Sequence, residues 1–398
     1  MGKNIVFCAD GTWNAPGAED DGNTEADTNV FKLFSNLASN SPPAADPDAK
    51  EQDCTLTEAD GSVLQVAKYL HGVGDSNNLL VKVLGGALGA GLIERVVRGY
   101  TFVSRNYAPG DKIFLIGFSR GAYTVRALAG LIDAKGLLDA TKLGLGDKVD
   151  GYRYGLGAWY DYRRAKLEAQ FGLLGRLDEV VSEIPTFFGF KAPVHAEEYV
   201  PAPIEVVAVW DTVGSYGTPA YNANLVRFDV FKFADLRLSA KVRNGLHAVA
   251  VDEQREDFEP TLWDADPRVT QVLFVGSHGD VGGGYPVCSQ SDAALKWMTG
   301  KLTQLGVRFA AVPAFVPQPD PRGLAHLQWK HPPWNQWLHS PRVFPAAGLL
   351  VSRSLVDRLG AGDVAPDPAD AAGPYAPANL PSYIVGGAAA PGVVIAEL

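Results

Sequence analysis

Cysteine is scarce in this sequence: Cys8, Cys54 and Cys288 are its three cysteines in 398 residues. The number is odd and no two of them form a Cys-x-x-Cys pair, so the pattern predicts neither a disulfide scaffold nor a structural zinc site. Cys8 lies inside the apolar stretch Asn4–Ala9, where a buried thiol that packs like a small apolar side chain is expected.

Positive charge is also in short supply. The 35 Lys and Arg residues face 45 Asp and Glu residues, which gives a formal net charge of −10 and an isoelectric point near 5.2. Proteins that bind nucleic acid usually present a basic face, so we expect no nucleic-acid partner. The same balance argues against simple electrostatic attraction to an anionic membrane surface, and leaves only peripheral membrane contact open.

Long apolar runs are missing as well. The longest, near Leu79–Leu92, is interrupted by Lys82 and by glycines. It is shorter than the roughly 20 residues that a membrane-spanning helix needs. Because the first apolar stretch starts at Asn4, we expect no signal peptide and a soluble protein made in the cytoplasm. The sequence leaves export by a signal-independent secretion system open.

The sequence does contain a nucleophile-elbow pattern, Gly-x-Ser-x-Gly, at Gly117–Gly121. The preceding run Ile113–Ile116 has the composition of a buried strand, and a helical spacing of apolar residues follows the motif. In α/β-hydrolases the serine of such a strand-to-helix turn is the nucleophile, and the next backbone N–H stabilises the oxyanion. The pattern therefore predicts Ser119 as the nucleophile and the N–H of Arg120 as an oxyanion donor.

The acid of a catalytic triad follows the nucleophile in the chain order of this fold. Ile204–Trp210 reads as a buried strand, and Asp211 stands directly after it, 92 residues beyond Ser119 (211 − 119). Asp252 and Glu253 compete for the role. We expect them to follow a helix, Ser239–Val251, which would not present them at the end of a strand. Asp211 is the predicted triad acid.

The predicted triad base is His278. It follows Val269–Val275, which we expect to be the last core strand, and it lies in a glycine-rich loop that could fold back over the serine. Asp280, two residues later, could brace this loop or pair with Arg120. The remaining candidates fit less well. His71 stands at a strand end, where it could face the site, although a structural histidine is the favoured interpretation. His247 lies within the expected helix, and His326, His331 and His339 lie in an irregular tail.

Asp10-Gly11-Thr12 follows the first predicted strand, Asn4–Ala9. An early strand-to-helix loop supplies the second oxyanion donor in hydrolases, so the N–H groups of Gly11 and Thr12 are candidates. A turn in which Asp10 supports the site by binding its own backbone is an equal alternative. The same motif begins the active site of haloacid-dehalogenase-type phosphatases, but their nucleophilic aspartate would fall on Cys8, which disfavours that chemistry.

The alternation of strands and helices predicts an α/β fold of the α/β-hydrolase type, with a mostly parallel central sheet, helices on both faces and a helical, aromatic cap insertion. We place the catalytic domain at residues 1–310, with the insertion at about 137–203, and a Pro-rich extension that packs on the core at 311–398. The insertion could instead pack on the sheet without covering the site. The other expected elements are helices Thr28–Leu37, Ile93–Tyr107 and Asp292–Leu305, an exposed loop Ser39–Glu58 and a strand Val63–Tyr69.

Taken together, the motifs resemble a known family. They are Asp10-Gly11-Thr12-Trp13-Asn14, the elbow with its helix, Val209–Val213, His247–Glu253, Phe258-x-Pro260-x-Leu262-Trp263 and His278–Tyr285. In this order the residues resemble the uncharacterised α/β-hydrolase family that includes the Tle1-like phospholipase effectors of type VI secretion. The resemblance covers about residues 1–300. It implies Ser119, Asp211 and His278 as the triad, ester bonds of lipids as the substrate, and a bacterial source.

The sequence therefore predicts a serine ester hydrolase of the lipase or phospholipase type that needs no cofactor and no metal. Its expected partners are a lipid or other ester substrate and, if the chain is a secreted effector, an immunity or adaptor protein. Two alternatives stay open at this point. One is a carboxylesterase for small soluble esters, and the other is a non-catalytic binding module on the same fold.

Overall fold

The protein is seen here in a computed structural model. It describes residues 2–11, 19–20, 23–24, 26–40, 51–72, 87–171, 192–213, 220–221, 227–228, 236–332, 334–336 and 338–398.

A nine-stranded sheet forms the centre of the described chain, in the order β19-β14-β13-β12-β9-β6-β1-β5-β4. All neighbouring strands are parallel except β4 and β5, which form an antiparallel hairpin at one edge. The bounds are β1 Asn4–Ala9, β4 Glu51–Thr57, β5 Val63–Leu70, β6 Lys112–Phe118, β9 Ile204–Trp210, β12 Val242–Ala250, β13 Val269–Phe274, β14 Leu350–Ser352 and β19 Ile395–Ala396.

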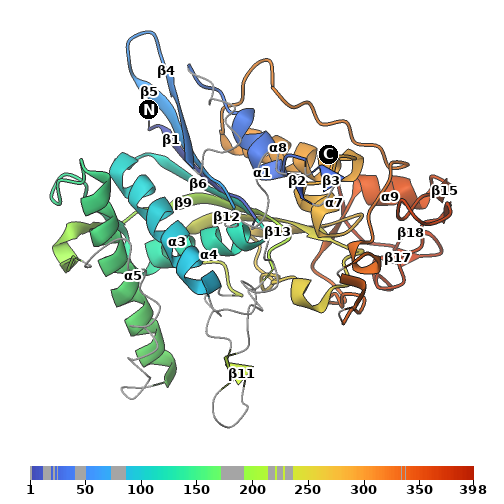
Figure 1. Ribbon diagram of the computed structural model, residues 1–398. Coiled ribbons are helices and arrows are strands. Elements are labelled where there is room, and N and C mark those ends of the chain that lie inside the picture. The colour runs from blue at the N-terminus through green and yellow to red at the C-terminus, as the bar shows by residue number, and fades with distance from the viewer. Residues whose placement is uncertain are drawn as a thin grey trace.

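Helices cover both faces of this sheet (Figure 1). One face carries α3 (Ala87–Asn106), α4 (Arg120–Lys135) and α5 (Lys148–Phe171), and the other carries α1 (Asn29–Ser35) and α8 (Ser289–Leu305). Each face has its own buried apolar cluster. The central strands are buried almost throughout because helices cover a parallel sheet on both sides. The protein is thus a mixed α/β fold with a large, mostly parallel sheet.

Shorter elements complete the described chain. They are the helices α7 His278–Gly282 and α9 Arg353–Leu359, the 3-10 turns Ala196–Glu198, Glu256–Phe258, Gln328–Lys330 and Trp334–Gln336, and the short strands β2 Glu19–Asp20, β3 Asn23–Thr24, β7 Leu137–Leu138, β8 Tyr199–Val200, β10 Ala220–Tyr221, β11 Arg227–Phe228, β15 Asp363–Val364, β16 Gly373–Pro374, β17 Ile384–Val385 and β18 Ala388–Ala389.

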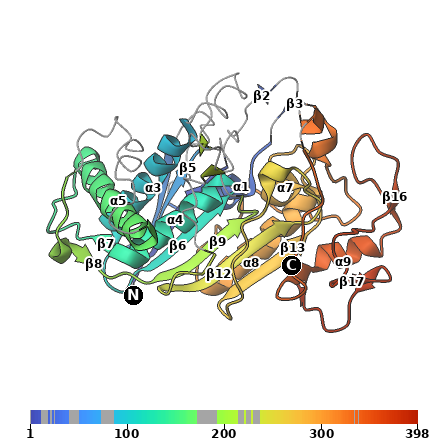
Figure 2. The ribbon, with the colours of Figure 1, turned by 90° about the horizontal axis from the view of Figure 1, so that it is seen from below.

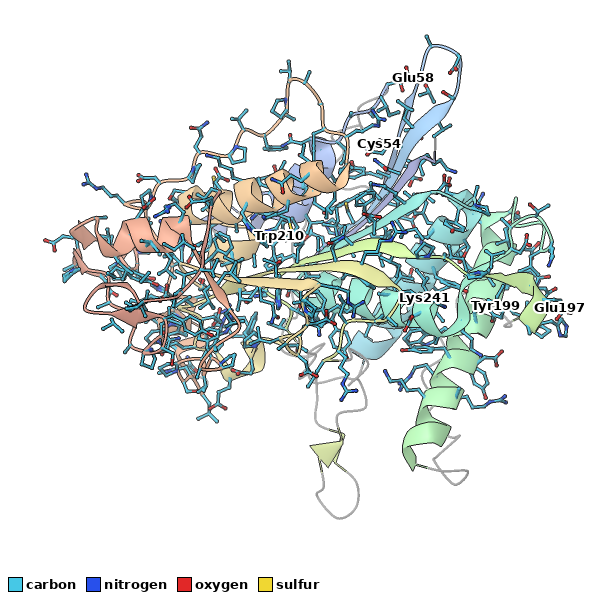
Figure 3. All side chains as sticks on the ribbon, turned by 180° about the vertical axis from the view of Figure 1, so that it is seen from behind. Cys54, Glu58, Glu197, Tyr199, Trp210 and Lys241 are labelled. Carbon is cyan, nitrogen blue, oxygen red and sulfur yellow. The ribbon has the colours of Figure 1, made fainter. Side chains whose placement is uncertain are left out.

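Two predicted elements are wrong. The segment Ser239–Val251, expected to be a helix, contains strand β12, which lies between β9 and β13. Its residues could also form a helix, but the backbone is held extended because both neighbouring strands form hydrogen bonds with it. The expected loop Ser39–Glu58 contains strand β4, whose side chains alternate between buried and exposed over Gln52, Asp53 and Cys54. Figure 3, which labels Cys54 and Glu58, shows this hairpin projecting from the sheet.

The segment after residue 310 contributes to the central sheet. β14 pairs with β13, and β19 pairs with β14, so the expected last strand β13 is an inner strand. α9 packs on this edge, where a third apolar cluster includes Val249, Leu273, Val351 and Leu355. Figure 2 shows this part at the opposite end of the sheet from α5. The extension is therefore built into the fold through backbone pairing as well as side-chain packing.

The insertion at about 137–203 is described in part. α5 packs against α3 and α4, and Trp159 and Tyr162 are buried in the apolar cluster of that face. These contacts match a helical elaboration on the sheet. The aromatic run Phe187–Phe190, which gave rise to the predicted cap, lies outside the described residues. No helix in the described ranges has both the length and the apolarity to cross a membrane.

Candidate active site

The strand-to-helix turn predicted around Ser119 is present. β6 ends at Phe118, Ser119 occupies the N-cap position, and α4 begins at Arg120. Ser119 has φ 57° and ψ −123°, a conformation that an L-residue adopts at a cost of about 1–3 kcal/mol. Its side chain makes no capping hydrogen bond, so the hydroxyl is not used to close the helix. Strain without a capping role is what a nucleophile elbow requires.

The two glycines of the motif allow close backbone approach. A Cβ on Gly117 would lie 2.5 Å from the carbonyl oxygen of Gly121, and a Cβ on Gly121 would lie 2.0 Å from that of Ala9. Both distances are far below van der Waals contact. The glycines therefore let α4 start directly against β6 and β1, which holds the elbow next to Asp10.

Asp211 and His278 are hydrogen-bonded partners. The Nδ1 of His278 lies 2.6 Å from Oδ2 of Asp211, and the backbone N–H of Ala250 donates to Oδ1 at 2.9 Å. Asp211 follows β9, is fully buried and has φ 36°. Ser119 and Asp211 are the two non-glycine residues with positive φ in the described part of the chain. The two strands that end at them, β6 and β9, are neighbours in the sheet.

The His278 ring is held beside the elbow. Its centroid lies 4.5 Å from that of Phe118, the residue before Ser119, and 5.0 Å from that of Phe258. The backbone N–H of His278 donates to Oε2 of Glu253 at 3.1 Å. His278 was expected in a loop; it is the first residue of the short helix α7, whose N-cap is Ser277.

The electrostatics of the pair favour a neutral imidazole. Burial lowers the pKa of His278 below its ordinary value, and the hydrogen bond to Asp211 opposes this in part. With Nδ1–H donating to Asp211, Nε2 carries the lone pair. A neutral ring oriented in this way can accept a proton.

Arg342 is a residue of the site that the sequence analysis missed. Its Nη1 donates to Oδ1 of Asp211 at 2.7 Å and its Nη2 to Oδ2 at 2.9 Å. Burial alone would raise the pKa of Asp211, but Arg342 and His278 outweigh it and hold that pKa well below its usual range. No periodicity or motif links Arg342 to a position 131 residues earlier, so no sequence signal could have identified it.

His247 was placed in a helix, and that prediction is wrong. It lies on β12, fully buried, where Nε2 accepts a hydrogen bond of 3.0 Å from the backbone N–H of Thr212. Its Nδ1 lies 3.3 Å from Oε1 of Gln271. Burial lowers the pKa of His247 to about 3, so this ring is a neutral structural group. It anchors the backbone next to Asp211.

Asp10 supports the turn after β1. Its Oδ1 accepts from the N–H of Gly11 at 2.7 Å, and its Oδ2 accepts from the hydroxyls of Thr28 and Tyr69 at 2.6 and 2.7 Å. Burial raises the pKa of Asp10 to about 6, against these hydrogen bonds. The N–H of Gly11 is thus engaged by Asp10, as in the turn alternative. Thr12 lies outside the described residues.

Asp280 braces the His278 segment. Its Oδ2 accepts from the N–H of Ser277 and from the N–H of His326, both at 2.9 Å, and its Oδ1 lies 2.7 Å from Nδ1 of His326. These bonds match the expected bracing of the loop, and burial lowers the pKa of Arg120, the other expected partner, to about 10. Asp252 and Glu253 follow strand β12, and Glu253 pairs with Arg255 at 2.7 Å. The hydrogen bond of Nδ1 of His278 goes to Asp211, and Glu253 binds the backbone N–H of His278.

Other histidines have contacts of their own. His331 binds the carboxylate of Asp367, His339 packs on Trp329, and the Nδ1 of His71 lies 2.7 Å from the carbonyl oxygen of Gly72. Across the described ranges, no three His, Cys, Asp or Glu side chains are grouped closely enough to hold a metal ion. All three cysteines are free, and Cys8 is buried as predicted.

The family described as "T6SS, Phospholipase effector Tle1-like, catalytic domain" matches residues 3–301 of this sequence. The chain belongs to this family. The strand ends that carry Ser119, Asp211 and His278 all fall within the matched region.

Other similarities are weaker. The uncharacterized protein YEL023C of Saccharomyces cerevisiae is 27% identical over 279 residues, which are 68% of this chain and 34% of the yeast protein. The Tle1 effector bound to the VgrG spike of a type VI secretion system is 16% identical, with a TM-score of 0.37, and the match covers 72% of this chain and 52% of that one. An uncharacterized protein from Pseudomonas aeruginosa is 16% identical with a TM-score of 0.39, over 77% and 46% of the two chains.

The chain thus spans about a third of the yeast relative and about half of each solved chain. Both TM-scores lie below 0.5, too low for a comparison of residue positions. A relative in yeast also means that the family match alone does not assign a bacterial source.

Proposed function

We propose that this chain is a serine ester hydrolase of the α/β-hydrolase type, with Ser119, His278 and Asp211 as its catalytic triad. The observation that carries the proposal is the 2.6 Å contact between His278 and Asp211 next to a serine with positive φ. His278 takes the hydroxyl proton as Ser119 attacks the ester carbonyl, and Asp211 orients the imidazole and balances its charge. His278 then gives this proton to the departing alcohol as the ester C–O bond breaks and the acyl-enzyme forms. Water attacks the acyl-enzyme, His278 takes the proton of that water and returns it to Ser119, and the carboxylic acid leaves.

The oxyanion is held by backbone N–H groups at the start of α4. The N–H groups of a first helical turn have no partner inside the helix, which makes that of Arg120 the first donor. Thr12 is our candidate for the second donor, because the N–H of Gly11 is engaged by Asp10. Loss of one such donor typically costs about 100- to 1000-fold in rate. The mechanism calls for no metal and no cofactor.

Family membership supports a lipid ester as the substrate, most directly a phospholipid. An immunity or adaptor protein and export by a type VI system are further proposals that depend on the chain acting as an effector. We also propose that residues 1–310 carry the catalytic machinery and that 311–398 complete it. A carboxylesterase for small esters and a non-catalytic module are outcomes that the test below distinguishes.

The test compares wild type, Ser119→Ala and Ser62→Ala. Ser62 is an exposed serine in the β4–β5 hairpin and serves as the matched control. Each protein is assayed on p-nitrophenyl esters from acetyl to palmitoyl chains and on vesicles of phosphatidylcholine or phosphatidylethanolamine. We expect wild type and Ser62→Ala to release fatty acid from vesicles, and Ser119→Ala to lose at least about 1000-fold in rate while keeping its fold.

Activity limited to short soluble esters would replace the phospholipase with a carboxylesterase and leave the triad in place. Activity retained by Ser119→Ala would remove Ser119 as the nucleophile. If wild type hydrolyses nothing and no partner restores turnover, the binding module becomes the better description.

A further inference from the structure

The triad acid is held by an arginine from the C-terminal extension. Arg342 is 2% exposed, Asp211 is fully buried, and the two make a bidentate pair with N–O distances of 2.7 and 2.9 Å. The guanidinium also donates to the carbonyl oxygens of Ala250, at 2.8 Å, and Phe258. The four acceptors are the two carboxylate oxygens of Asp211 and the two carbonyl oxygens. Because the guanidinium is planar, these hydrogen bonds fix its orientation, and the bidentate pair then fixes the orientation of the Asp211 carboxylate.

Arg342 is the counter-charge of Asp211. The second carboxylate near His278, Glu253, has its own partner, because Arg255 donates to it from Nε at 2.9 Å and from Nη2 at 2.7 Å. The two acids are thus paired separately with two arginines. The charged and titratable groups of the described chain that surround the Asp211–His278 pair are Arg342, Glu253, Arg255, Glu259, His247, Asp280 and Tyr285.

We propose that Arg342 is a positioning residue of the triad: it fixes the orientation of the Asp211 carboxylate and offsets its charge beside His278. The proposal rests on the function proposed above. It assigns a catalytic task to the extension, which lies outside the region that the family match covers.

The chemistry follows from charge and geometry. An isolated Asp211 would attract a proton to the buried Asp211–His278 pair and would keep the imidazole protonated to higher pH. Burial already lowers the pKa of His278, and the positive charge of Arg342 on Asp211 adds to this by opposing that proton, so the ring is able to act as a base near neutral pH. The bidentate contact also keeps Oδ2 in line with Nδ1 of His278, which holds the ring in the tautomer that general-base catalysis needs.

Two substitutions separate charge from geometry. Arg342→Met removes the charge and keeps much of the side-chain volume, whereas Arg342→Lys keeps the charge and loses the planar fork. Arg358→Met is the structural comparator, because Arg358 is also fully buried in the extension but binds the carbonyl oxygens of Pro321, Gly323 and Ala365. Arg353→Met, which breaks an exposed pair with Glu397, is the control for general effects.

The readout is kcat and kcat/KM for an ester substrate between pH 5 and 9. In Arg342→Met we expect the acidic limb of the kcat/KM profile to move up by about one to two pH units. In Arg342→Lys we expect the limb to stay in place and kcat to fall about 10- to 100-fold through lost alignment. We expect Arg358→Met to change the thermal stability without moving the acidic limb of the kcat/KM profile. We expect Arg353→Met to change neither the thermal stability nor the profile.

A second readout does not depend on turnover. A histidine Nδ1–H bound to a buried carboxylate gives a proton NMR signal far downfield, which is assigned by its loss in His278→Gln. The pH midpoint at which this signal titrates should rise by the same one to two pH units in Arg342→Met and stay unchanged in Arg342→Lys. If wild type hydrolyses no ester but the signal shifts in this way, the proposed function fails, and with it the positioning role in catalysis, whereas the effect of Arg342 on the charge of the Asp211–His278 pair stands.

Unchanged kcat, pH profile and NMR titration in a folded Arg342→Met would overturn the proposal. Should Arg342→Met fail to fold, Arg342→Lys decides. A loss of kcat at an unchanged pH midpoint supports the positioning role, and wild-type kinetics refute it.

Discussion

At the scale of single residues, the site depends on backbone conformations that side chains rarely adopt. Ser119 and Asp211 both have positive φ at the carboxyl ends of adjacent strands, and each is held by hydrogen bonds to neighbouring strands. The N–H of Ser119 donates to the carbonyl oxygen of Trp210 at 3.1 Å, and the N–H of Asp211 donates to that of Ala248 at 2.7 Å. Figure 3 labels Trp210, the last residue of β9, within the sheet. The sheet thus stabilises two strained residues beside one another.

Gly121→Ala tests the close approach at the elbow. The new Cβ would meet the carbonyl oxygen of Ala9 at 2.0 Å, and neither backbone can move without displacing Ser119. We expect a loss of about 2–4 kcal/mol in the free energy of unfolding and a large loss of esterase activity. Gly300→Ala in α8 is the control, since nothing lies within 4 Å of its Cβ, and it should gain about 0.5–1 kcal/mol. Urea denaturation of both variants checks the prediction, and a stable, active Gly121→Ala would contradict it.

At the scale of elements, β12 connects the core to the site. Its His247 accepts from the N–H of Thr212, and the N–H of Ala250 at its end donates to Asp211. The strand therefore fixes the backbone on both sides of Asp211. Only a neutral imidazole can accept the bond from Thr212, which makes this contact sensitive to acid.

The pH dependence of stability should show the contribution of His247. Its pKa is about 3 in the folded protein and about 6.5 when unfolded, so below pH 6.5 the unfolded chain binds a proton that the folded one excludes. Stability should therefore fall on acidification from pH 6.5 towards 3, by at most about 1.4 kcal/mol per pH unit. His247→Gln, whose amide oxygen can accept the same bond, should lose this dependence.

The comparison between the two proteins isolates His247. Burial raises the pKa of Asp10 and of Asp252 to about 6. These two carboxyl groups therefore make the folded protein more stable as the pH falls from 6 to 3.8, which is opposite to the effect of His247. Their contribution is the same in wild type and in His247→Gln. Urea denaturation at pH 7.5, 6 and 5 supplies the values. Equal pH dependence in wild type and His247→Gln would refute a buried, neutral His247.

Much of the sheet could be predicted from the sequence because its inner strands are continuous apolar runs. The elbow, Asp211 and His278 were found at the ends of such runs, where parallel strands bring side chains together. β12 was misread because Leu246–Ala250 fits a helix or a buried strand equally well, and only its neighbours decide. Arg342 and the bracing of Asp280 by His326 arise from tertiary packing of an irregular tail, which no local pattern encodes.

At the scale of the whole molecule, the extension is part of the central sheet and of the candidate site. It supplies β14 and β19 to the sheet, Arg342 to Asp211, and His326 to Asp280. Trp334 adds an edge contact with Phe258, which in turn packs on the ring of His278. The site is therefore assembled from segments more than two hundred residues apart in the chain.

Removal of residues 311–398 should abolish cooperative folding. The truncation exposes the β13 edge and the apolar cluster around Leu273, and it leaves the charge of Asp211 buried without Arg342. Loss of one partner of a buried ion pair alone costs about 3–5 kcal/mol, a large part of a typical stability. Circular dichroism should show no sharp thermal transition in this variant. A cooperative melt with retained esterase activity would show that residues 1–310 are self-sufficient.

The most direct test of the central claim is covalent labelling of the nucleophile. A fluorophosphonate reacts with a serine that a neighbouring base has activated, whatever the natural substrate. We expect one adduct per chain, located by mass spectrometry on the peptide that contains Ser119, and no adduct in Ser119→Ala or His278→Gln. An unlabelled wild-type protein, or a label that persists in Ser119→Ala, would contradict the account.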